Sequence, residues 1–255
     1  GLPRAFFFFP RAQPAPPAMA RAPRAAALLA LLACAGVHAA DPNRPHDHTG
    51  KLPPYSGSGK VPKVTGGMAA KLDTGAAVIE RVRDGKEGRG LVIQDVAAPP
   101  DVCWSKINDF PNYPKMVPQV TKVEVYGHNK AFNGTEHTFA KFTIGVLGIR
   151  IGYYMDLTHD PRRSSTTWTL DYSRNSDLDD SVGWWHVQPH PSKAKWSRVF
   201  YSTQIKVKGW VPKPIMDFLT NKALTESTAW VKRESEEAYT KQQSSAPPPR
   251  GGPRG

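Results

Sequence analysis

Cysteine is scarce in the chain, and the common sequence motifs of catalytic sites are missing. Its 255 residues include two cysteines, Cys34 and Cys103. If a cleaved leader removes Cys34, Cys103 is left alone, so neither an intramolecular disulfide nor a cysteine-based metal site is expected. The sequence has no phosphate-binding loop, dinucleotide-binding glycine motif, G-x-S-x-G elbow or H-E-x-x-H motif. We therefore predict no catalytic residue, no metal and no cofactor.

The central part of the chain has almost no net charge. The formal net charge is +12, of which +10 lies in residues 1–71 and 241–255, so residues 72–240 carry only +2. A basic face is the first requirement of a nucleic-acid-binding domain. Because the central part is almost neutral, a nucleic-acid partner is not expected.

The first forty residues have the pattern of a targeting leader. Met19 is followed by Arg21, Arg24 and an apolar run over residues 25–35, which is shorter than a membrane span. We predict that residues 1–40 consist of upstream residues and a cleaved signal peptide that starts at Met19. The expected destination is the secretory pathway or the extracellular space. A bipartite plastid leader and a lipoprotein signal are alternatives.

Two further segments are low in periodic pattern. Residues 41–71 are rich in Pro, Gly, His and Lys, and we predict a flexible linker there. Within it, His46 and His48 lack the additional spaced ligands that a metal site needs. Residues 241–255 end in SSAPPPRGGPRG and are expected to form a disordered tail. The folded domain is therefore predicted over residues 72–240.

The central part alternates apolar and polar residues in short runs separated by turn residues. This pattern, between residues 76 and 208, is typical of an antiparallel sheet. Residues 98–120 interrupt it with two short helical segments that are broken by prolines. Residues 212–241 predict one long amphipathic helix, because their apolar residues recur at spacings of three and four. These residues are Ile215, Phe218, Leu219, Ala223 and Trp230.

The segment APPDVCWSKINDFPNYPKMVPQV, from Ala98 to Val120, resembles the START-like/polyketide cyclase superfamily (SRPBCC, Bet v 1-like). Coq10-type and cyclase/dehydrase-type members are the most similar. The resemblance implies an α+β helix-grip fold: a curved antiparallel sheet of about seven strands wrapped around a long C-terminal helix, with two short helices after the first strands. It also implies a cavity for a hydrophobic ligand. The residues that carry it are Ala98, Pro99, Val102, Trp104, Ile107, Asp109, Phe110, Tyr113, Pro114, Val117 and Pro118.

Aromatic side chains are concentrated in the later strands and the last helix. Alternation places Tyr153 with Met155, and Trp168 with Leu170, on shared strand faces. Such faces form either an ordinary core or a cavity wall, and periodicity does not decide which face is concave. The residues predicted to line a cavity are Phe142, Tyr153, Met155, Trp168, Leu170, Tyr172, Trp184, Phe218 and Leu219.

Two surface features complete the sequence-based site predictions. Asn133-Gly134-Thr135 is an N-glycosylation sequon on an expected hairpin turn. Val146, Leu147 and Ile149 form an apolar hairpin tip, which is interpreted either as folded over a neighbour or as touching a membrane.

Three functions are consistent with these patterns. The first is a monomeric protein that binds and transports or presents a lipid or a quinone/isoprenoid-type molecule without covalent chemistry; the Coq10-type resemblance implies ubiquinone as one ligand. The alternative is a polyketide cyclase/aromatase-like enzyme that uses the same cavity. The third is a membrane-peripheral assembly factor without a ligand.

Overall fold

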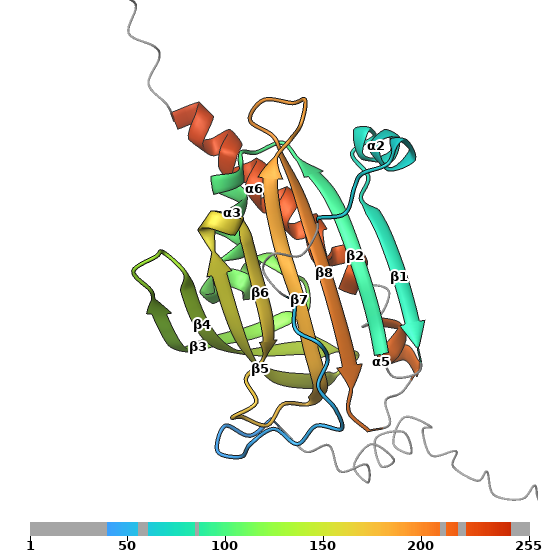
Figure 1. Cartoon of the computed structure of the whole chain (residues 1–255), viewed down its shortest axis with the longest axis vertical. Helices are drawn as coiled ribbons and strands as arrows, with labels where there is room; N and C mark the ends of the chain where they lie inside the picture. Colours follow the sequence, from blue (N-terminus) through green and yellow to red (C-terminus); the bar gives the residue numbers. More distant parts are fainter. Residues whose placement is uncertain (1–39, 56–60, 85–86, 210–212, 219–222, 246–255) are drawn as a thin grey trace, which may run out of the picture. The chain divides into compact units, whose positions relative to one another are not determined.

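The computed structural model describes residues 40–55, 61–84, 87–209, 213–218 and 223–245. Their main element is an eight-stranded antiparallel sheet with the strand order β1-β2-β8-β7-β6-β5-β4-β3 (Figure 1). This confirms the predicted fold class, with eight strands where about seven were expected. The strands are β1 (Val78–Asp84), β2 (Glu87–Val96), β3 (Val120–Lys130), β4 (Glu136–Val146), β5 (Ile149–Asp160), β6 (Ser165–Leu170), β7 (Leu178–Pro189) and β8 (Ser197–Val207).

A tight turn sets which side chains of β4 and β5 share a face. The turn residues Leu147 and Gly148 both have positive φ angles, 50° and 81°. Two such residues give a hairpin turn that follows the natural twist of the strands. The resulting register pairs Phe142 with Tyr153, whose rings stack with centroids 5.7 Å apart. Both side chains therefore lie on the same face of the sheet.

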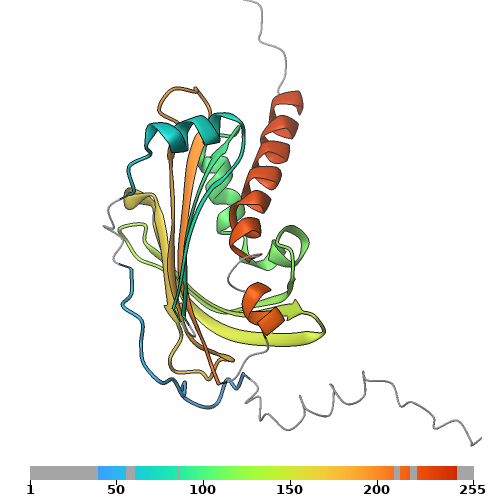
Figure 2. The same ribbon diagram turned by 90° about the vertical axis from the view of Figure 1, so that its right-hand side faces the viewer.

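The α-helices that follow β2 cover the concave face (Figure 2). Trp230 and Val231 of the last helix are buried in one apolar cluster with Cys103 and Ile107 of the helix that follows β2. The single helix predicted over residues 212–241 corresponds to α5 and α6, and residues 219–222 between them lie outside the described residues. The segments are α3 (Pro100–Ile107), the 3-10 helix η1 (Phe110–Asn112), α4 (Tyr113–Met116), α5 (Lys213–Asp217) and α6 (Ala223–Ser245).

The C-terminal helix extends beyond the point where the tail was predicted to begin. Residues 241–245 are helical, and Lys241 donates a hydrogen bond to Glu237 one turn earlier. Pairs at this spacing stabilise a helix. Residues 246–255 lie outside the described part of the chain, so the predicted disorder there stays a prediction.

The convex face is covered by residues that were predicted to be a flexible linker. Leu52 is 6% exposed, and α2 (Gly66–Asp73) buries Leu72 in one cluster with Phe200 of β8. Leu72 itself lies in the predicted domain, but the linker prediction is wrong for residues such as Thr49 and Leu52, because side chains of the sheet accept hydrogen bonds from their backbone amides. Asp179 accepts hydrogen bonds from the amide and hydroxyl groups of Thr49. An extended strap held in this way needs no apolar periodicity of its own.

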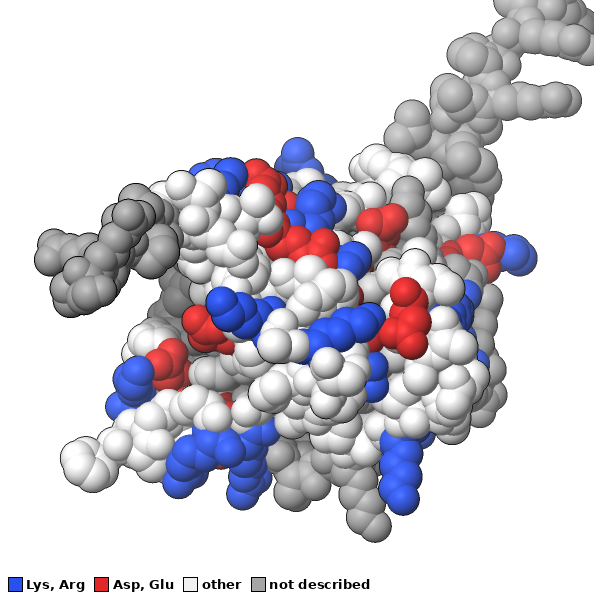
Figure 3. All heavy atoms as spheres, turned by 90° about the horizontal axis from the view of Figure 1, so that it is seen from above, with Lys and Arg blue, Asp and Glu red and all other residues white. Residues whose placement is uncertain are grey.

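Charges of both signs share the surface. On the face in Figure 3, Lys and Arg side chains are interspersed with Asp and Glu side chains over the middle of the view. Ion pairs such as Lys193 with Asp73, 3.0 Å apart, connect neighbouring elements. This mixture agrees with the near-neutral charge of residues 72–240.

Candidate ligand-binding cavity

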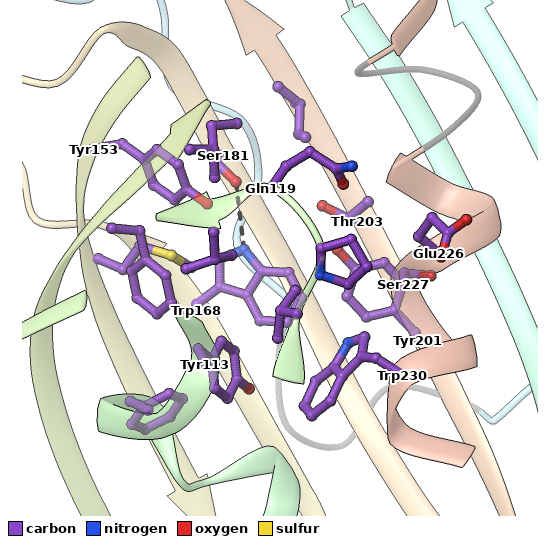
Figure 4. A pocket seen from close by; sticks show the side chains of 18 of the residues that line it. Tyr113, Gln119, Tyr153, Trp168, Ser181, Tyr201, Thr203, Glu226, Ser227 and Trp230 are labelled. Atoms are coloured by element: carbon purple, nitrogen blue, oxygen red, sulfur yellow. Dashed lines mark hydrogen bonds between the residues drawn. The ribbon is translucent and has the colours of Figure 1, made fainter. Parts of the chain in front are cut away.

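A pocket of about 190 Å³ lies between the concave face of the sheet and the helices that cover it. Its walls are mainly aromatic and apolar, with several polar groups among them (Figure 4). We call it the aromatic pocket. It is lined by Phe110, Tyr113, Val117, Pro118, Gln119, Val120, Phe142, Ile144, Tyr153, Met155, Leu157, Trp168, Leu178, Ser181, Trp185, Tyr201, Thr203, Ile205, Phe218, Glu226, Ser227 and Trp230.

The indole of Trp168 occupies the centre of the pocket wall because the neighbouring strand has a glycine opposite it. The register pairs Trp168 with Gly183 of β7. A Cβ atom at position 183 would overlap Cζ2 of the indole and lie 2.5 Å from the carbonyl oxygen of Ser202. The indole stacks on Tyr201, with centroids 5.7 Å apart, and its Nε1–H donates to Ser181 Oγ at 3.4 Å. Gly183 therefore sets the shape of the pocket.

The hydroxyl group of Tyr153 points into the aromatic pocket (Figure 4). Among the described residues it has no hydrogen-bond partner, whereas the hydroxyl of Tyr113 donates to the Ile107 carbonyl. Burial raises the pKa of Tyr153, and it raises the pKa of Tyr201 to about 12, so both phenols are protonated at neutral pH. Its oxygen is not among the polar atoms that are both fully buried and unpartnered, so it is open to the space of the pocket. Tyr153 is therefore a free donor for an oxygen atom of a bound molecule.

Four polar side chains of the pocket lie near one another. In Figure 4, Gln119, Thr203, Glu226 and Ser227 lie on the side of the pocket opposite Tyr153. Gln119 has a φ angle of 66°, which is uncommon for a residue other than glycine, and its carbonyl accepts the Gly145 N–H at 2.9 Å. The pocket is therefore amphipathic, with a polar edge and an aromatic body.

Few groups in the pocket can exchange protons near neutral pH. The described lining contains one carboxylate, Glu226, and no histidine, lysine or cysteine. General acid–base catalysis uses such groups within hydrogen-bond reach of the reacting atoms. Apolar walls with neutral hydroxyl donors are instead suited to holding an uncharged molecule in one orientation.

The structure brings together five of the nine residues predicted to line a cavity. Phe142, Tyr153, Met155, Trp168 and Phe218 line the aromatic pocket. Leu219 lies outside the described residues. The other three do not line the pocket.

The prediction of the site was wrong for three residues: Leu170, Tyr172 and Trp184. Leu170 packs in a cluster with Ile215 of α5 and is not among the described pocket-lining residues. Tyr172 lies past the end of β6, and its hydroxyl donates to Asp180 at 3.0 Å. Trp184 is on the convex face against Phe200, with ring centroids 6.4 Å apart. Alternation along an isolated strand does not show where the strand leaves the pocket. It also does not show which of the two alternating sets of side chains faces inward.

The pocket also contains residues that the sequence-based prediction missed. Trp185 and Tyr201 pair across β7 and β8, with ring centroids 4.4 Å apart, and both line the pocket. The sequence carries no local signal for them, because the pairing that places Gly183 opposite Trp168 and leaves room for these rings is set by the strand register. Tyr113 and Trp230 come from helices, where strand alternation gives no information.

Only part of the predicted membrane-contact tip is exposed. Leu147 is 73% exposed at the hairpin turn, whereas Val146 is 2% exposed in a cluster with Leu178. Ile149 is partly buried against the same cluster. No helix in the described ranges is both long and apolar enough to cross a membrane.

His46, the first of the two histidines in the N-terminal segment, is held by contacts with the backbone of the sheet region. The backbone N–H of Ser176 donates to His46 Nδ1 at 3.1 Å, and His46 Nε2 lies 2.7 Å from the Asp179 carbonyl oxygen. The described residues contain no group of three or more His, Cys, Asp or Glu side chains arranged to hold a metal ion.

The fold and the pocket define a helix-grip protein with an internal apolar site. Residues 92–236, more than half of the chain, match the family described as polyketide cyclase/dehydrase and lipid transport. The chain belongs to this family, which agrees with the resemblance to the START-like superfamily, whereas a specific relation to Coq10-type members stays a prediction. No curated protein matches the chain.

Solved structures with a similar fold share little sequence with this chain. TTHA0849 from Thermus thermophilus has 15% identity and a TM-score of 0.49, covering 62% of this chain and 99% of its own. The STAR-related lipid transfer protein from Xanthomonas axonopodis has 11% identity and a TM-score of 0.48, with 62% and 92% covered. The Zhui aromatase/cyclase from Streptomyces sp. R1128 has 18% identity and a TM-score of 0.40, with 66% and 87% covered.

Proposed function

We propose that this protein binds a hydrophobic small molecule of the lipid or quinone/isoprenoid type in the aromatic pocket and transports or presents it unchanged. The observation that carries the proposal is the protonated, unpaired hydroxyl of Tyr153 inside an aromatic cavity. The family, which includes lipid transport, supports a hydrophobic ligand. A single oxygen on that ligand would satisfy Tyr153.

Apolar burial would supply most of the binding free energy, and Tyr153 would supply orientation. Removing apolar surface from water contributes ~25 cal/mol per Å², before the loss of freedom on binding is subtracted. One hydrogen bond adds about 0.5–1.5 kcal/mol net. Sites for drug-sized ligands usually measure ~300–1,000 Å³. Because the aromatic pocket measures only about 190 Å³, its ligand must be slender or must extend beyond it.

The Tyr153→Phe variant tests the proposal. It removes the hydroxyl and keeps the ring, so we expect about three- to ten-fold weaker binding of an oxygen-bearing ligand with an almost unchanged melting temperature. Binding of 1-dodecanol and of a short-tailed ubiquinone analogue would be measured by calorimetry. Tyr154→Phe is the matched control, because Tyr154 follows on the same strand and packs against Tyr126 on the convex side.

Native mass spectrometry of the chain mixed with a lipid and quinone extract would supply the mass of the natural ligand. Wild-type protein that binds neither probe and retains no adduct would contradict the proposed function. Equal losses in the Tyr153 and Tyr154 variants would show that the Tyr153 hydroxyl does not touch the ligand.

The same phenols favour a second candidate, a cyclase/aromatase-like enzyme. Tyr153 and Tyr201 are protonated donors whose pKa values are raised by burial. Donors of this kind can stabilise the negative charge that develops on a carbonyl oxygen during ring closure. A ligand recovered with its mass unchanged supports transport or presentation. Recovery of a product that has lost water supports cyclase/aromatase-like activity.

We also propose transient membrane contact through Leu147. This side chain is 73% exposed at the β4–β5 turn, and Arg150, three residues later, is exposed. Burying a leucine side chain contributes about 1.5–3 kcal/mol, so Leu147→Asp is expected to reduce co-sedimentation with anionic vesicles at least about ten-fold. Phe132→Asp is the control, because Phe132 is fully exposed at the opposite end of β4. Equal losses in both variants would contradict a specific contact at Leu147.

We propose a secretory route for the chain, although its predicted leader lies outside the described residues. Asn133 is exposed at the β3–β4 turn, and its Oδ1 accepts the Thr135 N–H at 2.9 Å. Expressed in eukaryotic cells, the chain is expected to be secreted with a glycan that a glycosidase removes, and Asn133→Gln is expected to abolish the mass shift. Retention of an uncleaved, unmodified chain inside the cells would contradict this proposal.

A further inference from the structure

A second pocket, of about 200 Å³, lies farther along the same concave face. On β5, His159 follows Leu157 at the next inward position, and on β6, Thr166 precedes Trp168. The concave face therefore changes from apolar to polar along the strands. We call this second site the polar pocket; its polar lining consists of Asn108, His128, Glu136, Thr138, His159 and Thr166.

Two side chains separate the polar pocket from the aromatic pocket. Phe110 of η1 and Leu157 of β5 line both pockets, and the described linings share no other residue. The Phe110 ring lies against Tyr113 and Phe142, with centroids 5.5 Å and 6.3 Å away. The partition therefore consists of side chains, whose rotamers can change without moving a strand.

The polar pocket is lined by hydroxyl, amide and imidazole groups and by one carboxylate, Glu136. Thr166 Oγ1 donates to Asn108 Oδ1 at 3.4 Å and therefore accepts from His159 Nδ1–H, 2.9 Å away. Burial lowers the pKa of His159 and keeps its ring neutral. The charge of Glu136 is balanced by Lys130 at 2.6 Å.

His128 and Thr138 form a similar pair, with Nδ1 and Oγ1 3.1 Å apart. A charged head group would lose water in this pocket without gaining an unpaired countercharge, which is unfavourable. A hydroxyl group, which both donates and accepts, matches the available partners.

We infer that the two pockets are halves of one site for an elongated apolar molecule that carries an uncharged oxygen function at each end. One oxygen would meet Tyr153, and a hydroxyl at the other end would enter the polar pocket once the Phe110 side chain turns aside. Together the two pockets exceed the lower limit of ~300 Å³ for small-molecule sites. This inference rests on the proposed function and deepens it by naming the ligand class.

The test compares α,ω-alkanediols, from decanediol to hexadecanediol, with the corresponding 1-alkanols. For wild-type protein, the diol of matching length is expected to bind about ten-fold more tightly than the alkanol of equal length. Thr138→Val and Thr166→Val are each expected to remove this preference, because each weakens binding of the diol more than binding of the alkanol. Thr158→Val should keep it, because Thr158 forms an equivalent pair with His137 Nδ1, 3.2 Å away, on the opposite face.

The outcomes separate the inference from the function on which it rests. Wild-type protein that binds alkanols but shows no preference for any diol overturns the inference alone. A preference that survives both Thr138→Val and Thr166→Val, or that Thr158→Val also removes, overturns it as well. Failure to bind both series overturns the proposed function and the inference together. Melting temperatures of the three valine variants exclude a general loss of folding.

Discussion

The Gly183→Ala variant is expected to lose ligand binding and about 1–3 kcal/mol of stability. A methyl group at this position overlaps the Trp168 indole and approaches the Ser202 carbonyl to 2.5 Å, so the indole or the strand must move. Trp168 is 6% exposed and forms the centre of the pocket wall. Any displacement of its ring therefore changes the space available to the ligand. Urea unfolding and calorimetric titration with 1-dodecanol would measure the two effects.

Gly145→Ala is the control for this variant. Gly145 also lies within a strand, but its added methyl group would meet only the Thr121 side chain at 3.2 Å, and Gly145 is not among the described pocket-lining residues. Stability and binding close to wild type are expected. If Gly183→Ala bound the probe normally, Trp168 would not form the ligand-contacting wall that the structure indicates.

Arg198→Met is expected to destabilise the protein by about 3–5 kcal/mol at neutral pH, because it leaves a buried carboxylate without its partner. Asp95 is 1% exposed and accepts hydrogen bonds from Arg198 Nε at 2.7 Å and Nη2 at 2.9 Å. His190 Nε2 lies 3.0 Å from the same carboxylate. Urea unfolding at neutral pH measures the loss. Lys193→Met is the control, since its partly exposed ion pair with Asp73 contributes about 0–1 kcal/mol.

The effect of Arg198→Met depends on pH in a definite direction. Burial alone would raise the pKa of Asp95, but the hydrogen bonds and charge of Arg198, with His190, hold it below its ordinary value. In the wild type, this contribution to stability is present above the unfolded-state pKa of about 3.9 and is lost as the pH falls through the folded-state pKa. Without Arg198, burial raises the pKa of Asp95 instead. Protonation of Asp95 then removes the unpaired buried charge and stabilises the variant. The difference in unfolding free energy should therefore shrink between pH 7 and pH 4. A difference that stays constant would show that Asp95 does not cause it.

Much of the fold could be predicted because its elements have strong local patterns. The prolines between residues 98 and 120 interrupt the sheet where α3, η1 and α4 are found. The short link at Leu147 and Gly148 predicted the β4–β5 hairpin, and alternation then placed Tyr153 and Met155 on one face. These features depend on residues that are close in sequence, so they can be recognised without the tertiary structure.

The candidate site was only partly predictable, because its shape depends on how separate elements meet. Trp184 and Trp185 are adjacent and alike in composition, and the sequence contains nothing local that says which one faces inward. The decision comes from the register of β7 with β8, which pairs Trp185 with Tyr201. Trp230 reaches the same pocket from α6, a contact that no strand pattern contains.

By itself, the sequence determined the antiparallel sheet, the short helices after the first strands, the helical C-terminal region and the aromatic character of the concave face. Each follows from periodicity or from turn residues that act over a few positions. Only the tertiary structure decided that residues 40–55 are ordered, that Gly183 shapes the pocket around Trp168, and that Phe110 divides an apolar from a polar pocket. The physical reason is that these features depend on contacts between residues far apart in the chain, such as Thr49 with Asp179, which exist only after the sheet has formed.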